Sequence, residues 1–173
     1  IRNGCATGGS AVAMAANAWV ALIDGAKLTL AQNFTLAAGS DWELVRSSIV
    51  GPGSLLVGAG TTMLVLGSST ISASGENRGT ITIEGRPVAT DEYGPANLKL
   101  GGAFLNTGVI TLTSTAQQVS QITVQVGATL TNAATGVING LRGAGGTRGI
   151  VLGGDVANAG RIAVADDVVF QVV

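Results

Sequence analysis

NTGVITLT, Asn106–Thr113, decides the fold, because looser copies of this stretch occur three more times in the 173-residue chain. The copies are ENRGTITIEG (Glu76–Gly85), TNAATGVING (Thr131–Gly140) and ANAGRIAV (Ala157–Val164). All four contain an Asn, a short gap, a Gly, any residue and an Ile. Their glycines, Gly79, Gly108, Gly136 and Gly160, recur at a regular interval along the chain. A sustained period in the range of roughly 20–50 residues indicates a repeat architecture.

Two earlier stretches have a Gly at the same spacing but lack the Asn. Gly53 of GPGSLLV precedes Gly79, and Gly25 of GAKLTL precedes Gly53, each by a similar interval. Each unit contains two or three short alternating strands separated by Gly-rich turns, as in one coil of a parallel β-helix. We therefore predict an all-β, single-domain β-solenoid (parallel β-helix) of about six coils over residues 25–173, with units of about 27 residues.

The shared Asn and Gly have a physical reason at a corner of the coil. Gly tolerates the positive φ of a sharp corner, and Asn tolerates it nearly as well. Stacked side chains at one corner form a hydrogen-bonded ladder along the axis. The expected ladder is Asn77, Asn106, Asn132 and Asn158, beside Gly79, Gly108, Gly136 and Gly160. TNAATG has two extra residues, so either this corner bulges or Asn132 lies out of line.

Two segments depart from the repeat. Residues 1–24 form an apolar N-terminal segment, a cap or an assembly strand, in which Ser10–Gly25 suits a helix by its Ala content and a strand by its alternation. The all-β context favours the strand. A loop insertion is expected at residues 85–102, and loops on a rigid solenoid are common places for function. Its candidate ligand residues are Asp91, Glu92 and Tyr93.

The composition argues against several functions. Charged residues make up 11%, the net charge is −1 and no basic cluster occurs, so we expect neither nucleic acid nor membrane insertion. With no His and one Cys, Cys5, a zinc site is not expected. The Gly-rich stretch Gly143–Gly149 lacks the ending of a phosphate-binding loop, and no cofactor is expected.

Enzymatic and ice-binding functions are the less favoured alternatives. A polysaccharide-degrading enzyme would need a pair of carboxylates, and Asp41 and Glu43, two apart on a strand, are expected to share one face. The other acid pairs are Asp91/Glu92 and Asp166/Asp167. Ice binding would need Thr-x-Thr pairs in phase, but Thr80/Thr82, Thr111/Thr113 and Thr129/Thr131 do not recur in every unit. We therefore expect that the protein is not an enzyme.

The N-x-G-x-I-x-V/L units resemble the β-solenoids of bacterial secreted surface proteins, of the filamentous-haemagglutinin-like adhesin and autotransporter-passenger type. The resemblance covers most of the chain from Gly25 onward. It implies an extracellular, right-handed parallel β-helix that serves as a stalk, an adhesin or a matrix component.

Apolar residues at both ends of the sequence suggest assembly. DDVVFQVV, Asp166–Val173, is an apolar strand with no polar cap after it, although further coils would leave the same open strand. The interface residues expected for head-to-tail stacking are Val12, Met14, Trp19, Val20, Leu22, Val168, Val169, Phe170 and Val172. We expect a filament of homo-oligomers at the cell surface, or else an adhesin that recognises a glycan or a host protein through the 85–102 loop or its flat faces.

Overall fold

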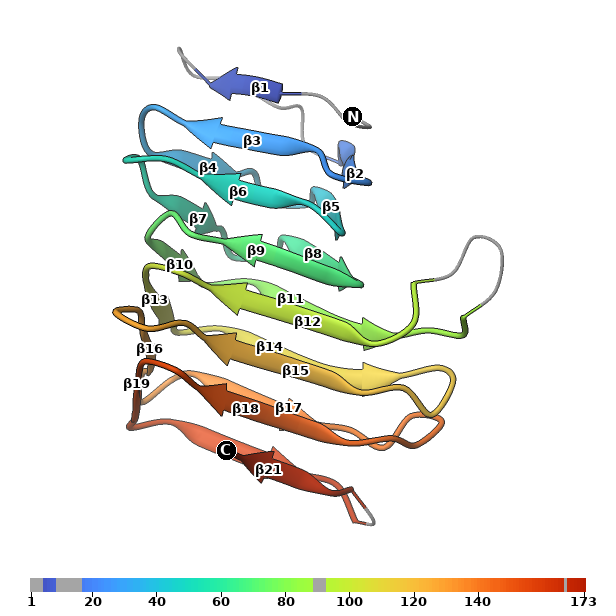
Figure 1. Cartoon of the computed structure of the whole chain (residues 1–173). Helices are drawn as coiled ribbons and strands as arrows, with labels where there is room; N and C mark the ends of the chain where they lie inside the picture. The colour runs from blue at the N-terminus through green and yellow to red at the C-terminus, as the bar shows by residue number, and fades with distance from the viewer. Residues whose placement is uncertain (1–4, 9–16, 89–92, 167) are drawn as a thin grey trace.

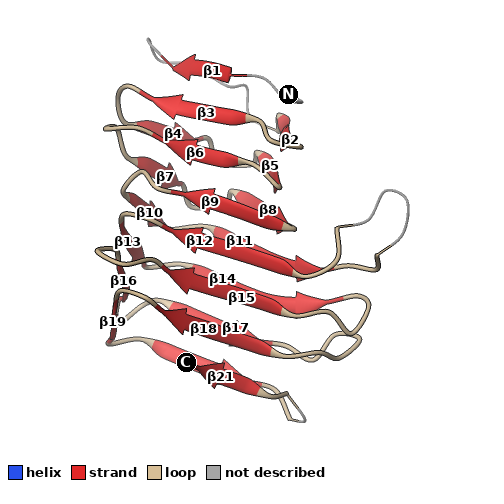
Figure 2. Ribbon diagram, in the orientation of Figure 1, coloured by secondary structure: helices blue, strands red, loops and turns tan. Residues whose placement is uncertain are grey.

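The protein is a stack of parallel coils (Figure 1), described by a computed structural model over residues 5–8, 17–88, 93–166 and 168–173. All regular elements of these residues are strands, coloured red in Figure 2. One coil places a strand in each of three sheets, here called A, B and C. Six complete coils run from β2 to β19, followed by β20 and β21. The predicted parallel β-solenoid of about six coils is therefore confirmed.

The three sheets are entirely parallel, and each strand pairs with its counterpart in the next coil. Sheet A contains β2 (Trp19–Ile23), β5 (Asp41–Val45), β8 (Thr62–Leu66), β11 (Thr80–Gly85), β14 (Val109–Ser114), β17 (Val137–Gly140) and β20 (Arg161–Val164). Sheet B contains β1 (Cys5–Gly8), β3 (Lys27–Leu30), β6 (Ser48–Val50), β9 (Ser68–Ile71), β12 (Ala96–Leu100), β15 (Ser120–Val124), β18 (Arg148–Leu152) and β21 (Phe170–Val172). Sheet C contains β4 (Phe34–Leu36), β7 (Leu55–Val57), β10 (Gly75–Asn77), β13 (Ala103–Asn106), β16 (Thr129–Asn132) and β19 (Asp155–Asn158).

The core lies inside the coil, where the inward residue of each strand meets the same position of the next coil. Ile81, Ile110 and Ile138 pair in register along sheet A and are fully buried. In the N-terminal coils, Trp42 from sheet A contacts Phe34 from sheet C edge to face, with ring centroids 5.8 Å apart. The alternation of apolar and polar residues thus separates core from surface, because successive side chains of a strand point to opposite faces.

The repeat length differs between the two halves, which corrects part of the sequence prediction. In the later coils Thr80 pairs with Val109 and Val109 pairs with Val137, which keeps the predicted long period. In the first coils Trp19 pairs with Asp41, Asp41 with Thr62 and Thr62 with Thr80, so register partners lie much closer in the sequence. The extension of the long period to the first coils was therefore wrong.

Two glycines that seemed to continue the period lie at other corners. Gly25 precedes β3 of sheet B and Gly53 precedes β7 of sheet C, whereas Gly79 precedes β11 of sheet A. Their spacing matched the later period by coincidence. The solenoid also begins before Gly25, because β1 pairs with β3 and β2 pairs with β5.

The difference in repeat length arises mainly at the corner between sheets A and B. Gly67 alone joins β8 to β9, whereas residues 86–95 join β11 to β12 and residues 141–147 join β17 to β18. The other two corners contain between two and four residues in each described coil. In Figure 1 residues 115–119 and 141–147 lie on the same side of the stack as the described ends of the 86–95 connection. Insertions are therefore confined to one corner.

The predicted loop at residues 85–102 is shorter than expected. Ala96–Leu100 forms β12, whose Leu98 and Leu100 are fully buried in the core. This stretch alternates as a strand should, but the proline-containing segment before it obscured the pattern. The connection itself covers residues 86–95. The N-terminal ambiguity is resolved for Trp19–Ile23, which is a strand; residues 9–16 lie outside the described residues.

Shortening the connection at residues 86–95 tests this description of the corner. We expect that removal of residues 87–93 leaves the β-sheet circular dichroism intact, because Gly67 makes the same corner with one residue. Stability should fall by about 1 kcal/mol or less, mainly through loss of the cation–π contact between Arg46 and Tyr93. The measurement is urea unfolding.

The control is a deletion of equal length, residues 122–128, which removes most of β15 from the core. We expect this variant to lose the fold. Equal damage from both deletions would contradict the assignment of residues 86–95 as a dispensable connection.

Candidate functional site

A ladder of asparagine side chains follows the corner between sheets C and A. The Nδ2 of Asn77 donates to Oδ1 of Asn106 at 2.8 Å, and Asn106 donates in turn to Asn132 at 2.7 Å. Asn132 donates to Asn158 at 2.7 Å. The predicted ladder therefore exists, and all its donations run in one direction along the axis.

Each donating amide also satisfies a backbone group of the next coil. The Nδ2 atoms of Asn77, Asn106 and Asn132 reach the carbonyl oxygens of Val109, Val137 and Arg161 at 3.1, 3.3 and 3.4 Å. These three Asn side chains are fully buried. A buried amide is tolerated because its donors and acceptors have partners. The ladder thus ties neighbouring coils together through side chain and backbone at once.

Asn132 is in line with the ladder. Of the two alternatives predicted from TNAATG, a bulged corner or a misplaced Asn132, the first is therefore correct. It pairs in register with Asn106 and Asn158. The two extra residues are therefore accommodated by a wider corner at residues 133–136.

The glycines beside the ladder are required by close approach rather than by positive φ. A Cβ on Gly108 would lie 2.4 Å from the carbonyl oxygen of Gly79, and one on Gly160 would lie 2.3 Å from that of Gly136. None of Gly79, Gly108, Gly136 and Gly160 has a positive φ. The positions were predicted correctly, but the expected backbone reason was wrong.

The last coil exposes side chains that point toward the core. Val164 pairs in register with Gly140, and Val172 pairs with Ile150, which is buried. Val164 and Val172 are nevertheless 43% and 58% exposed, because no strand of the described residues covers this coil. Asn158 is also exposed, unlike the three other members of the ladder.

The residues expected at an assembly interface have different environments. Trp19 is 63% exposed, and Val169 is exposed as well, whereas Leu22 is buried in the core and is unavailable as a surface contact. Its position on the inward face of β2 explains the burial. Val20 and Phe170 are half-buried against the core, and Val168 is also half-buried. Val12 and Met14 lie outside the described residues.

The candidate ligand loop places Tyr93 against the solenoid. The guanidinium carbon of Arg46 lies 4.8 Å from the centroid of the Tyr93 ring, and Arg46 also forms an ion pair with Asp24. One face of the ring is thus occupied by an intramolecular cation. Asp91 and Glu92 lie outside the described residues.

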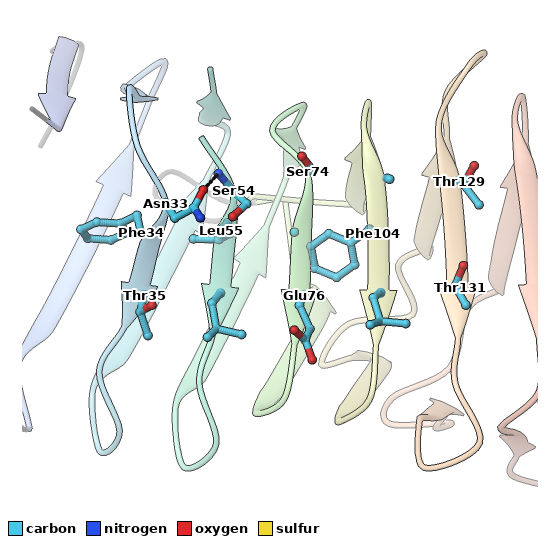
Figure 3. A pocket seen from close by; sticks show the side chains of 14 residues that line it. Asn33, Phe34, Thr35, Ser54, Leu55, Ser74, Glu76, Phe104, Thr129 and Thr131 are labelled. Carbon is cyan, nitrogen blue, oxygen red and sulfur yellow. Dashed lines mark hydrogen bonds between the residues drawn. The ribbon is translucent and has the colours of Figure 1, made fainter. Parts of the chain in front are cut away.

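A groove of about 510 Å³ lies along sheet C (Figure 3). Side chains of five successive strands, β4 to β16, contribute to it, with small polar residues such as Thr35 and Thr131 beside apolar ones such as Leu56 and Leu105. Phe104 fills the space over Gly75, where a Cβ would lie 2.7 Å from the ring. Sequence reasoning missed this groove, because its lining comes from positions distant in the chain.

One carboxylate of the groove is fixed. Glu76 accepts hydrogen bonds from Arg78 at 2.7 and 2.9 Å and from the Thr107 hydroxyl at 3.4 Å. The hydrogen bonds from Arg78 hold the pKa of Glu76 below its usual value. Glu76 therefore presents a compensated charge to the groove.

A second hollow, of about 250 Å³, lies on sheet A and is lined by Trp19, Asp41, Glu43 and Leu64, among others. Asp41 and Glu43 do share the outer face of β5, as predicted. An aromatic side chain lies beside this acid pair, because Trp19 of the preceding coil pairs in register with Asp41.

Arg148 is a buried cation that the sequence did not reveal. Its guanidinium donates to five backbone carbonyls at 2.7–3.0 Å, those of Gln118, Leu141, Arg142, Gly145 and Thr147. Burial lowers the pKa of Arg148. The arrangement holds the two long connections of neighbouring coils, residues 115–119 and 141–147, and its role is structural.

In the described residues, no group of three or more potential His, Cys, Asp or Glu ligands is placed to hold a metal ion. Nor do they contain a helix that is long and apolar enough to cross a membrane.

Replacing Asn106 tests the ladder. We expect Asn106→Ala to lower the free energy of unfolding by about 3 kcal/mol, because inside the core it removes the side-chain acceptor of one Asn77 N–H and the donor to the Asn132 side-chain carbonyl. Asn158→Ala is the matched control and should cost about 1 kcal/mol or less, since Asn158 is exposed. Chemical denaturation measures both, and equal losses would contradict a structural role for the buried ladder.

Comparisons with known proteins give no relative from which a function can be transferred. No protein-family model, curated protein or solved structure matches this chain. Its function therefore has to be inferred from the fold and from the surfaces described above.

Proposed function

We propose that this protein is an extracellular structural subunit that stacks head to tail into a filament or surface fibre. The observation that carries the proposal is the open core of the last coil. Val164 and Val172 face the inside of the coil but remain exposed, and residues in register with them in earlier coils are covered. A coil from a second copy would bury them as the internal coils bury one another.

The asparagine ladder supports the same arrangement. Asn77, Asn106 and Asn132 each donate to the following coil, whereas the amide of Asn158 has no following coil among the described residues. A second copy placed there would meet unpaired strand edges, an unused amide donor and apolar side chains. Because the surfaces at the two ends differ, such an interface is heterologous and does not close, which gives a filament.

The opposite end offers apolar groups for this contact. Val20 and Phe34, on the first strands of sheets A and C, pack against the core and are only half-buried. Few charged residues and a resemblance to bacterial surface solenoids support an extracellular location. With about 4.8 Å between strands, six coils would give a rise of roughly 30 Å per subunit.

Electron microscopy and sedimentation test stacking. We expect the wild-type chain to form filaments whose axial repeat equals the rise of one subunit, and a Val164→Glu/Val172→Glu variant to remain as short rods. These charges would be buried at the joint without partners. The matched control places a charge on the lateral face of β15 through Gln121→Lys, which should still assemble.

Two results would argue against the filament. One is a wild-type chain that stays monomeric over a wide range of concentration. The other is a Gln121→Lys variant that loses assembly to the same extent as the end variant, since lateral association would then explain the polymer.

An adhesin is the second candidate, and the groove on sheet C is the observation that favours it. We infer a binding surface there because polar side chains (Thr35, Glu76 and Thr131) alternate with Leu56 and Leu105 across five strands, a combination that suits the hydroxyl and C–H faces of a glycan. The 86–95 connection joins sheet A to sheet B rather than bordering sheet C, and is less suited to contribute to the same ligand.

A glycan array with a blocked groove tests the adhesin. Leu105→Arg should abolish any binding by filling the groove on β13, whereas Gln121→Arg on sheet B should leave it unchanged. Binding that survives in the Leu105→Arg variant would exclude the groove as the site. Filament formation is measured separately, so the two functions can fail independently.

A further inference from the structure

The hollow on sheet A combines an exposed indole with two carboxylates. Trp19 on β2 and Asp41 on β5 are register partners, so their side chains leave the same face of adjacent strands. Glu43 lies two residues along β5 on that face. Thr62 and Leu64 of β8 complete the outer lining of the hollow. Three strands thus bring together groups that are far apart in the sequence.

The carboxylates of this hollow lack the intramolecular arginine partner that three other acids of the solenoid have. Asp24, Glu76 and Glu84 each form an ion pair with an arginine. In the described residues, neither Asp41 nor Glu43 forms such a pair, and the lining of the hollow contains no Lys or Arg. The hollow therefore carries two negative charges that the chain does not compensate locally.

The indole of Trp19 indicates which class of cation would bind in the hollow. Trp19 is 63% exposed, so a face of the ring is open to contact. Tryptophan is the aromatic side chain that attracts cations most strongly, and a planar guanidinium can stack on it while its N–H groups bind a carboxylate in bidentate fashion. A compact ammonium lacks this planar fit.

A similar arrangement of guanidinium, aromatic ring and carboxylate occurs elsewhere in the chain. Arg46 lies over the Tyr93 ring while pairing with Asp24, so a guanidinium already bridges an aromatic ring and a carboxylate in this protein. At the sheet A hollow, the aromatic ring and the carboxylates are present and the cation is not supplied by the lining.

We propose that Trp19, Asp41 and Glu43 form a binding site for a guanidinium group, presented as an arginine side chain by another protein chain. The site itself does not depend on the proposed filament; only the first of its two sources of arginine does. Arg161 is one source within a second copy, because it lies on the last strand of sheet A. A different protein is the other source, and both are recognised by the same chemistry.

Nuclear magnetic resonance of the two indole N–H groups tests the site directly. N-acetyl-argininamide is the probe, and the matched neutral probe is N-acetyl-citrullinamide, which has a urea in place of the guanidinium. We expect the arginine probe to shift the Trp19 signal in a saturable manner and to shift the signal of Trp42 less, because Trp42 is buried behind the same hollow. Equal shifts from the citrulline probe would overturn the proposal.

Isosteric variants separate charge from structure. Asp41→Asn/Glu43→Gln should weaken binding of the arginine probe by about threefold to tenfold without altering the unfolding transition, because the charges are removed and the shape is kept. Asp155→Asn, an exposed acid on β19, is the control and should bind as the wild type does. An unchanged affinity in the double variant, or no saturable shift in the wild type, would refute the site.

Dilution distinguishes the two sources of the guanidinium. If a second copy supplies it, the Trp19 signal of the wild type should change with protein concentration, and Arg161→Gln should abolish that change. If the signal is independent of concentration while the arginine probe still binds, the source is a different protein. A filament that forms normally with Arg161→Gln would leave the stacking proposal intact and would remove Arg161 as the source.

Discussion

Parallel pairing of each coil with its own counterpart is the constraint on which this structure depends. Because neighbouring strands are about 4.8 Å apart and in register, every side chain is surrounded by the residues at the same position of adjacent coils. An isoleucine column such as Ile81, Ile110 and Ile138 satisfies this condition by packing. The buried asparagines satisfy it by donating to one another. A residue therefore fits at a position only when the residues in register with it in the neighbouring coils can pack against it or hydrogen-bond to it.

This constraint explains how much of the fold the sequence predicted. The phrase shared by the last coils repeats at one corner, so the all-β solenoid, its number of coils and the asparagine ladder were predicted correctly. The first coils have Leu36 and Val57 at the ladder position, where no polar signal marks the corner. Without that signal, Gly25 and Gly53 were assigned to the wrong corners, since spacing alone does not distinguish them.

Surface sites were harder to predict than the core. The neighbourhood of Trp19 and Asp41 depends on the short repeat of the first coils, which the later coils do not share. The groove on sheet C likewise depends on the lateral order of strands. Arg148 was missed for a different reason, because its partners are backbone carbonyls, which no pattern of side chains reveals. Candidate surface sites of this kind depend on which residues of neighbouring strands lie side by side. That strand register is known only from the structure.

The uneven corners have a consequence for how such a chain tolerates change. Two corners are held to a few residues by the ladder and by contacts between backbones, whereas the corner between sheets A and B accepts anything from Gly67 alone to residues 86–95. Length can thus vary there without shifting any column of the core. The strands and the two short corners must keep their spacing, whereas the corner between sheets A and B is free to change in length and sequence. New surface features can therefore be acquired at that edge while the stack remains unaltered.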